Sequence, residues 1–279
     1  MVRIVTDSST LITAEEAEKM GIDMIPLCVT IGDMEGRDLA VDMDDFYGRI
    51  AKGEIPRSSQ PPIGDVVDVY EKYPDDEIIN ISMADGLSGT YQTACGAKEI
   101  VDNGDNITVI NSKTLCGPHK YMVEKAQEMN LAGKSAQEII DYVNGMIEKT
   151  ESFLIPQDFS FLRRGGRLTP MAAAFGSVLR LKPIMTLTKD CKRLDKYAIK
   201  RTLAASVKAV IERMQKNNVG ENHIVYVTHA NTLEDANKVV QQIKEAIPGV
   251  EVIMHDLSPV FVTQGGPSCI AIQYIERSL

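Results

Sequence analysis

Short apolar segments rich in β-branched residues alternate with helical stretches along the chain, and this alternation constrains the fold more than any other feature. Residues 77–82 and 106–110 are two such segments, and a helical pattern over 88–101 separates them. Earlier in the chain, Thr13 and Glu16 form a capping-box pattern that opens a helix, and residues 22–31 are expected to form an extended segment. Continuous apolar runs of this length are typical of strands that helices cover on both faces. The sequence therefore predicts an α/β fold, not an all-α or all-β one.

The same alternation continues through the second half of the chain. Two consecutive helices are expected over 118–130 and 135–149, and a new strand is expected to start soon after Thr150. A chain of 279 residues also exceeds the usual size of a single core. We therefore expect two α/β domains, residues 1–150 and residues 151–279. In the second domain, strands are expected at 152–155, 183–187, 192–199, 223–228 and 250–255.

Charge and cysteine usage limit the partners and the compartment. A formal net charge of −9 repels phosphate backbones, so we expect no nucleic-acid partner and at most transient contact with a membrane. No apolar stretch approaches the roughly 18 residues of a membrane span, and no signal peptide is visible. The five cysteines form no C-x-x-C pair. These features predict a cytoplasmic protein with free thiols.

The motifs of catalytic and cofactor-binding sites are all incomplete. The Gly-Lys-Ser at 133–135 resembles the end of a P-loop, but Glu128 stands where that motif needs a glycine. We interpret Gly133 as a helix C-terminus and Ser135 as the next N-cap. The second glycine of a G-x-S-x-G elbow is misplaced after Ser88, no G-x-G-x-x-G follows a strand, and the histidines lack metal-ligand spacing. No catalytic site, metal or cofactor is predicted.

Clusters of hydroxyl and glycine residues follow several predicted strands. They are Asp7-Ser8-Ser9, Ser58-Ser59-Gln60-Pro61, the segment 86–90 around Ser88 and the segment 263–267. In open α/β sheets, ligands bind beyond the carboxyl ends of strands, and hydroxyls with free N–H groups suit a carboxylate. Each cluster alone is more typical of a cap or turn, so their number carries the interpretation of a binding site.

The chain resembles the DegV family from its first strand to its C-terminus. The motifs that carry the resemblance are Asp7-Ser8-Ser9, Arg57-Ser58-Ser59-Gln60-Pro61, Leu87-Ser88-Gly89-Thr90-Tyr91, Leu162-Arg163-Arg164-Gly165-Gly166-Arg167-Leu168, Lys182-Pro183-Ile184 and Arg201-Thr202. The resemblance implies a fold of two α/β domains with a tunnel for one long-chain fatty acid. It also implies that the protein presents this lipid to a separate fatty-acid kinase and has no complete catalytic site of its own.

The resemblance also implies roles for individual residues. Ser58 and Ser88 would bond the carboxylate, and Ser59 and Gly89 would supply backbone contacts. Arg167 and Arg201 would face the phosphoryl donor or the kinase, with Arg201 directed to the partner. The family commonly has a histidine where this chain has Gln264. Glutamine can hydrogen-bond a carboxylate but cannot carry a proton near neutral pH, so lipid binding tolerates this change better than phosphotransfer does.

The physics of lipid burial agrees with these expectations. Burying an acyl chain of about 16 carbons stabilises a complex by on the order of 10 kcal/mol before costs are subtracted. The carboxylate opposes burial and needs hydroxyl and N–H donors. The 13 methionines, with no tryptophan, suit a pliable lining as well as an ordinary core. Residues 171–175 are a candidate tunnel wall or a helix-packing surface.

Two other functions stay open at this point. One is a small-molecule enzyme, either phosphoryl-transferring or carbonyl-handling, that uses Asp7, His229 and Arg167. The other is a protein-interaction module in which basic residues dock a partner and a bound lipid is only structural.

Overall fold

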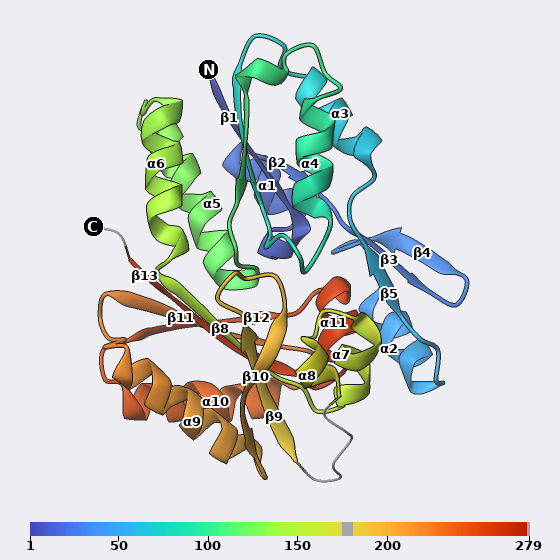
Figure 1. Ribbon diagram of the computed structural model, residues 1–279, viewed down its shortest axis with the longest axis vertical. Coiled ribbons are helices and arrows are strands. Elements are labelled where there is room, and N and C mark those ends of the chain that lie inside the picture. The colour runs from blue at the N-terminus through green and yellow to red at the C-terminus, as the bar shows by residue number, and fades with distance from the viewer. Residues whose placement is uncertain (175–180, 278–279) are drawn as a thin grey trace. The chain divides into compact units, whose positions relative to one another are not determined.

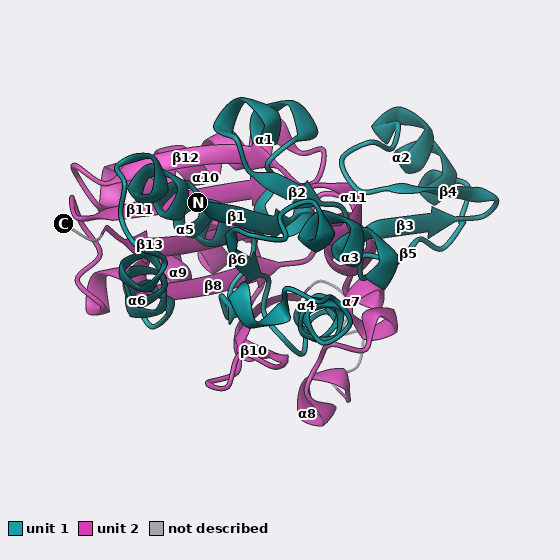
Figure 2. Ribbon diagram, turned by 90° about the horizontal axis from the view of Figure 1, so that it is seen from above, with its two compact units in different colours: residues 1–148 teal, residues 149–279 magenta. Residues whose placement is uncertain are grey.

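The chain divides into two compact units, Met1–Glu148 (unit 1) and Lys149–Leu279 (unit 2), which Figure 2 colours separately. The computed structural model describes residues 1–174 and 181–277. Each unit has its own sheet and its own apolar core. Within the described residues, no helix combines the length and the apolar character that a membrane crossing requires.

Unit 1 is built on a parallel four-stranded sheet in the order β2-β1-β6-β7. Helices α3 and α4 lie on one face of the sheet and α5 and α6 on the other (Figure 1). Val5, Ile78 and Ile107 pack against α3 on one of these faces. The strands are β1 (Val2–Asp7), β2 (Asp23–Ile25), β6 (Glu77–Ser82) and β7 (Ile107–Asn111), and the helices are α1 (Ala14–Met20), α3 (Ile63–Glu71), α4 (Thr90–Lys98), α5 (Cys116–Leu131) and α6 (Ala136–Ile147), with short 3-10 turns η1 (Ser8–Thr10) and η2 (Gly104–Asn106).

A small antiparallel sheet in unit 1 corrects one expectation. Residues 22–31 look like a single extended segment, but the chain leaves β2 at Pro26 and enters a second sheet with β3 (Cys28–Ile31). Pro26 has no N–H to donate to a ladder, and the N–H of Leu27 donates to Ser8 Oγ at 3.1 Å instead. The sheet has the order β4-β3-β5, with β4 (Met34–Arg37) and β5 (Arg57–Ser59), and α2 (Met43–Ala51) connects these two strands.

The helix ends in unit 1 confirm the local signals. Thr13 and Glu16 form a capping box at the start of α1, and Ser135 and Glu138 form another at the start of α6. Gly133 follows α5 with a φ of +75°, a left-handed value that favours glycine. The Gly-Lys-Ser at 133–135 is therefore a helix-to-helix turn.

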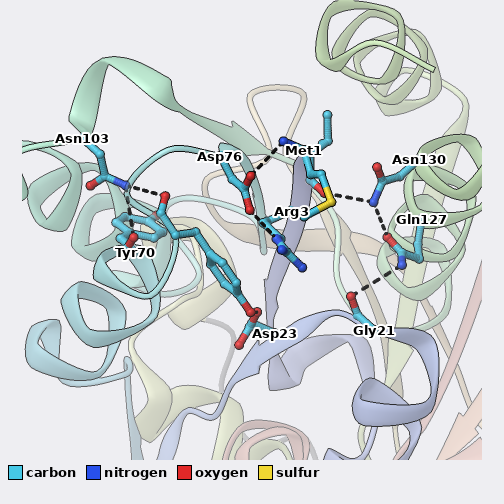
Figure 3. A network of polar contacts seen from close by, with 11 residues as sticks. Met1, Arg3, Gly21, Asp23, Tyr70, Asp76, Asn103, Gln127 and Asn130 are labelled. Atoms are coloured by element: carbon cyan, nitrogen blue, oxygen red, sulfur yellow. Dashed lines mark hydrogen bonds and ion pairs between the residues drawn. The ribbon is translucent and has the colours of Figure 1, made fainter. Parts of the chain in front are cut away.

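Polar contacts hold the amino-terminal end of β1 in the main sheet (Figure 3). Asp76 accepts hydrogen bonds from the amino group of Met1 and from Arg3 Nε, both at 2.8 Å. On α5, Asn130 donates to the Val2 carbonyl at 3.1 Å, and Gln127 donates to the Met20 carbonyl at 2.7 Å. The start of β1 is thus tied to α5 and to the turn before β6, and α5 is in turn tied to α1.

Unit 2 is built on a mixed six-stranded sheet in the order β10-β9-β8-β13-β11-β12. Among the neighbouring strand pairs that the structure describes in this sheet, β11 with β12 is parallel and the others are antiparallel. Val207, Val210 and Val239 of α9 and α10 pack on the sheet with Phe153 and Ile272. The strands are β8 (Thr150–Ile155), β9 (Lys182–Leu187), β10 (Leu194–Lys200), β11 (His223–His229), β12 (Glu251–Asp256) and β13 (Ile270–Glu276), and the helices are α7 (Phe159–Gly165), α8 (Pro170–Ala173), α9 (Leu203–Lys216), α10 (Leu233–Ala246) and α11 (Pro259–Gly265).

The candidate tunnel wall at 171–175 is only partly described. Met171 and Ala172 belong to the short helix α8. Met171 is 78% exposed, whereas Ala172 is buried against Leu162, Leu168 and Met185. Phe175 lies outside the described residues.

His119 on α5 is fully buried in a polar network of unit 1. Its Nε2 lies 2.9 Å from the Ile81 carbonyl, and its Nδ1 lies 3.0 Å from Ser9 Oγ. A neutral ring with the proton on Nε2 satisfies both contacts, because it then donates to the carbonyl and accepts from the serine. Burial lowers the pKa of His119 below its usual 6.5, although the nearby Asp7 opposes that shift.

We expect His119 to make the protein less stable as the pH falls below its ordinary pKa. The unfolded state binds this proton first, so the contribution of the neutral ring is complete above about pH 6.5 and is lost at up to about 1.4 kcal/mol per pH unit below it. Urea unfolding of the wild type and of His119→Gln between pH 5 and 7.5 measures this slope. Equal slopes in the two proteins would contradict the assignment.

Candidate functional site

The Ser58-Ser59 segment lies on β5, the edge strand of the small sheet in unit 1. β5 pairs antiparallel with β3, so that Ser58 is opposite Val29 and Ser59 is opposite Cys28. Ser58 is half-buried and Ser59 is exposed. The Ser58 hydroxyl is therefore the more shielded of the two.

Ser88 and Gly89 lie in the loop that leads from β6 into α4. The Ser88 hydroxyl is 2.7 Å from the hydroxyl of Thr90 and accepts the Thr90 N–H at 3.3 Å. Gly89 is the N-cap of α4 and has no side chain to cap it. The first-turn N–H groups of an α-helix have no partner within the helix, so this end suits an anion. Thr90 lies within a predicted cluster, but the sequence alone assigned it no role.

Gln60 brings these two serine segments together. A Cβ placed on Gly89 would collide with the side-chain carboxamide of Gln60, so that carboxamide occupies the space which glycine leaves open. The φ of Gly89 is −74°, which any residue can adopt, so the requirement for glycine here is one of space. Sequence reasoning did not assign Gln60 a role, and its position next to Ser59 is the only signal that points to it.

The Asp7-Ser8-Ser9 cluster has a structural role beside these loops. The Asp7 carboxylate accepts the N–H groups of Ser9 and Met83, both at 2.9 Å. Ser8 Oγ donates to Asp38 at 2.8 Å. Asp7, Ser8 and Ser9 are all buried, with at most 2% exposure. Asp7 therefore joins β1 to the loop after β6.

In unit 2, Arg167 and Gln264 both contact Gly165. Arg167 Nη1 donates to the Gly165 carbonyl, and a Cβ placed on Gly165 would collide with Gln264 Oε1. Gln264 Nε2 also donates to Thr263 Oγ1 at 3.2 Å. Both side chains are half-buried. The structure therefore brings together these two predicted site residues, which are about a hundred positions apart in the sequence.

Arg167 keeps its positive charge in this surrounding. Burial lowers the pKa of its guanidinium below the usual value. An arginine in a protein nevertheless remains protonated across the physiological range. Unit 2 thus holds a partly desolvated cation next to the amide of Gln264.

Arg201 and His229 lie elsewhere in unit 2. Arg201 is exposed directly before Thr202, which caps α9 by accepting the Ala205 N–H at 3.1 Å. His229 ends β11, is 3% exposed, and its Nδ1 lies 3.3 Å from Asp256 Oδ1.

Comparison with known proteins decides the family. The family model described as "Uncharacterised protein, DegV family" matches residues 1–277. The chain belongs to the DegV family. Protein DegV of Bacillus subtilis is 31% identical over 277 residues, which is 97% of this chain and 98% of that protein. The resemblance drawn from the motifs is confirmed.

Solved structures of similar proteins share the fold. The crystal structure of DegV from Bacillus subtilis, a fatty acid binding protein, matches with a TM-score of 0.87 and 30% identity over 99% of each chain. A stearic acid-binding protein from Eubacterium ventriosum matches with a TM-score of 0.87 and 22% identity, again over 99% of each chain. The predicted α/β fold is confirmed.

The contact between Gln60 and Gly89 predicts a coupled pair of substitutions. Gly89→Ala is expected to destabilise the protein because the new methyl group displaces the Gln60 carboxamide. The cost should fall by roughly 0.5–1 kcal/mol when Gln60 is already alanine. Urea unfolding of the wild type, the two single variants and the double variant gives the four free energies of unfolding that this double-mutant cycle needs.

Gly64→Ala is the matched control for this cycle. Gly64 also lies at the start of a helix, and a Cβ there meets nothing within 4 Å. Its substitution should be neutral or slightly stabilising. If Gly89→Ala has the same cost with and without Gln60, the contact is not the reason for glycine at position 89.

Proposed function

We propose that this protein binds a single long-chain fatty acid and holds the carboxylate with the hydroxyls of Ser58 and Ser88. The observation that carries the proposal is the placement of the two serine segments side by side through Gln60 and Gly89. The Ser88 hydroxyl and the first-turn N–H groups at the start of α4 suit a carboxylate and can compensate for its desolvation. The fatty-acid-binding relatives supply the ligand class.

The other predicted site residues enter the proposal with distinct roles. In unit 1, Ser59 and Gly89 supply backbone N–H groups to the carboxylate. In unit 2, Gln264 contributes an amide and Arg167 a positive charge to ligand binding. A charged donor or acceptor makes a hydrogen bond about twice as strong as a neutral pair does. The protein would therefore bind the anionic form of the lipid.

We also propose that the bound lipid is presented to a separate fatty-acid kinase, so that this chain is a cytoplasmic carrier without a catalytic site of its own. Arg201 is exposed and suits contact with that partner. The sequence has five cysteines and no C-x-x-C pair, which suits a reducing compartment. We further propose that residues 1–150 and 151–279 are two domains, since each unit has its own sheet and core.

Lipid loading tests the carrier proposal directly. Mass spectrometry of an organic extract from the purified protein is expected to give close to one fatty acid per chain. Ser88→Ala should then weaken binding of palmitate or oleate by about 1–3 kcal/mol, because a hydrogen bond to the carboxylate is lost. Fluorescence displacement or calorimetry measures that affinity.

Ser135→Ala is the control for this variant. Ser135 caps α6 on an exposed surface, so its loss should cost about 1 kcal/mol of stability without changing lipid affinity. A clean extract together with no uptake of added palmitate would reject the carrier function. Unchanged affinity in Ser88→Ala would remove only Ser88 from the site.

Presentation to a kinase is tested at Arg201. Arg201→Glu is expected to leave fatty-acid affinity unchanged. It should slow phosphorylation of the bound lipid by a bacterial fatty-acid kinase at least about tenfold, because the new carboxylate would repel an acidic surface of the kinase. Radiolabelled ATP measures the transfer. Equal rates for the wild type and the variant would show that Arg201 does not face the kinase.

A further inference from the structure

The side chain of Gln60 occupies the space where the N-cap side chain of α4 would lie. The N-cap of this helix is Gly89, which has no side chain. A Cβ placed on Gly89 would lie 2.7 Å from Gln60 Cδ and 3.2 Å from Gln60 Nε2, and it would be closer still to Gln60 Oε1. A residue that directly follows β5 therefore takes the place that a serine or an aspartate commonly has at a helix start.

These distances give the orientation of the Gln60 carboxamide. Oε1 is the atom nearest to the Cβ position of Gly89, so the negative end of the amide dipole faces the start of α4. This orientation suits the positive end of the helix macrodipole. Nε2 is the farther of the two polar atoms and lies on the outer side of the group. The amide therefore presents its two N–H donors beside the start of the helix.

Backbone donors and the Gln60 amide are both available at the start of α4. The first hydrogen bond of the helix runs from the Thr93 N–H to the Gly89 carbonyl at 2.8 Å. The N–H groups of Tyr91 and Gln92 therefore precede the helical ladder. Within residues 1–174 and 181–277, the Gln60 carboxamide has no hydrogen-bond partner, and the residue is exposed. A ligand that arrives from solvent can therefore accept from this amide.

The backbone around Gln60 relates its side chain to that of Ser58. β5 ends at Ser59, and Gln60 stands directly before Pro61, which restricts the preceding residue to extended conformations. Side chains two positions apart in an extended segment point to the same side. Because Gln60 contacts Gly89, we expect the Ser58 hydroxyl to be directed toward the same loop.

We propose that Gln60 donates a hydrogen bond from Nε2 to the carboxylate of the fatty acid and thereby selects an ionised headgroup. This inference rests on the fatty-acid binding proposed above and adds a third side chain to Ser58 and Ser88. An ionised carboxylate only accepts hydrogen bonds, and a charged acceptor makes a bond about twice as strong as a neutral one does. Gln60 therefore favours a fatty acid over the uncharged alcohol of the same chain length.

The affinities of two variants of the full chain for palmitate and for hexadecanol test this role. Gln60→Met keeps the length of the side chain but removes both donors. It should raise the dissociation constant about tenfold for palmitate and at most about threefold for hexadecanol, whose oxygen is a neutral acceptor. Gln60→Glu keeps an oxygen beside Gly89 but adds a negative charge. At about pH 8 it should weaken palmitate binding at least about a hundredfold and leave hexadecanol binding within about threefold of the wild type.

Gln137→Met is the matched control, because Gln137 is an exposed glutamine on α6 whose Nε2 donates to Asp141 at 2.8 Å. It should leave both affinities unchanged, and circular dichroism confirms that each variant is folded. A wild type that binds no palmitate rejects the proposed function and the role of Gln60 together. A wild type that binds palmitate no better than Gln60→Met does overturns the role of Gln60 alone. An equal loss for palmitate and hexadecanol also overturns it, because a packing role affects both ligands alike.

Discussion

The buried carboxylate of Asp7 is the interaction on which the carboxyl edge of the unit 1 sheet depends. It is 2% exposed and accepts one N–H from η1 and one from the loop after β6. A buried donor left without an acceptor costs about 1–3 kcal/mol, so one side chain stabilises the ends of two neighbouring strands. His119 extends the same network through Ser9. The loop that Asp7 fixes at Met83 leads directly to Ser88.

The carboxylate-binding hydroxyls that we propose come from two different sheets. Ser58 lies on an edge strand of the small antiparallel sheet, and Ser88 follows a strand of the parallel sheet. Their placement depends on the turn at Pro26, which sends the chain from one sheet to the other, and on the packing of Gln60 over Gly89. A ligand that needs two hydroxyls at once is therefore sensitive to how these two sheets are joined.

Unit 2 uses a glycine in a similar way. The side chains of Arg167 and Gln264 both contact Gly165. Arg167 donates to the Gly165 carbonyl, and Gln264 occupies the space where a Cβ of residue 165 would lie. A glutamine in this position is neutral at every physiological pH, whereas a histidine would titrate. The chain thus keeps a hydrogen-bond donor at this position but no titratable group.

Features that depend on near neighbours in the chain could be predicted from the sequence. Helix starts at Thr13 and Ser135 and the helix end at Gly133 were predictable, because caps involve residues three or four positions apart. The α/β alternation and the family motifs were also visible. Three other features became apparent in the folded structure. β13 lies between β8 and β11, and β2 and β3 belong to different sheets. The Gln60 side chain also covers Gly89. These contacts join distant segments, and their choice depends on packing and backbone pairing that no local pattern encodes.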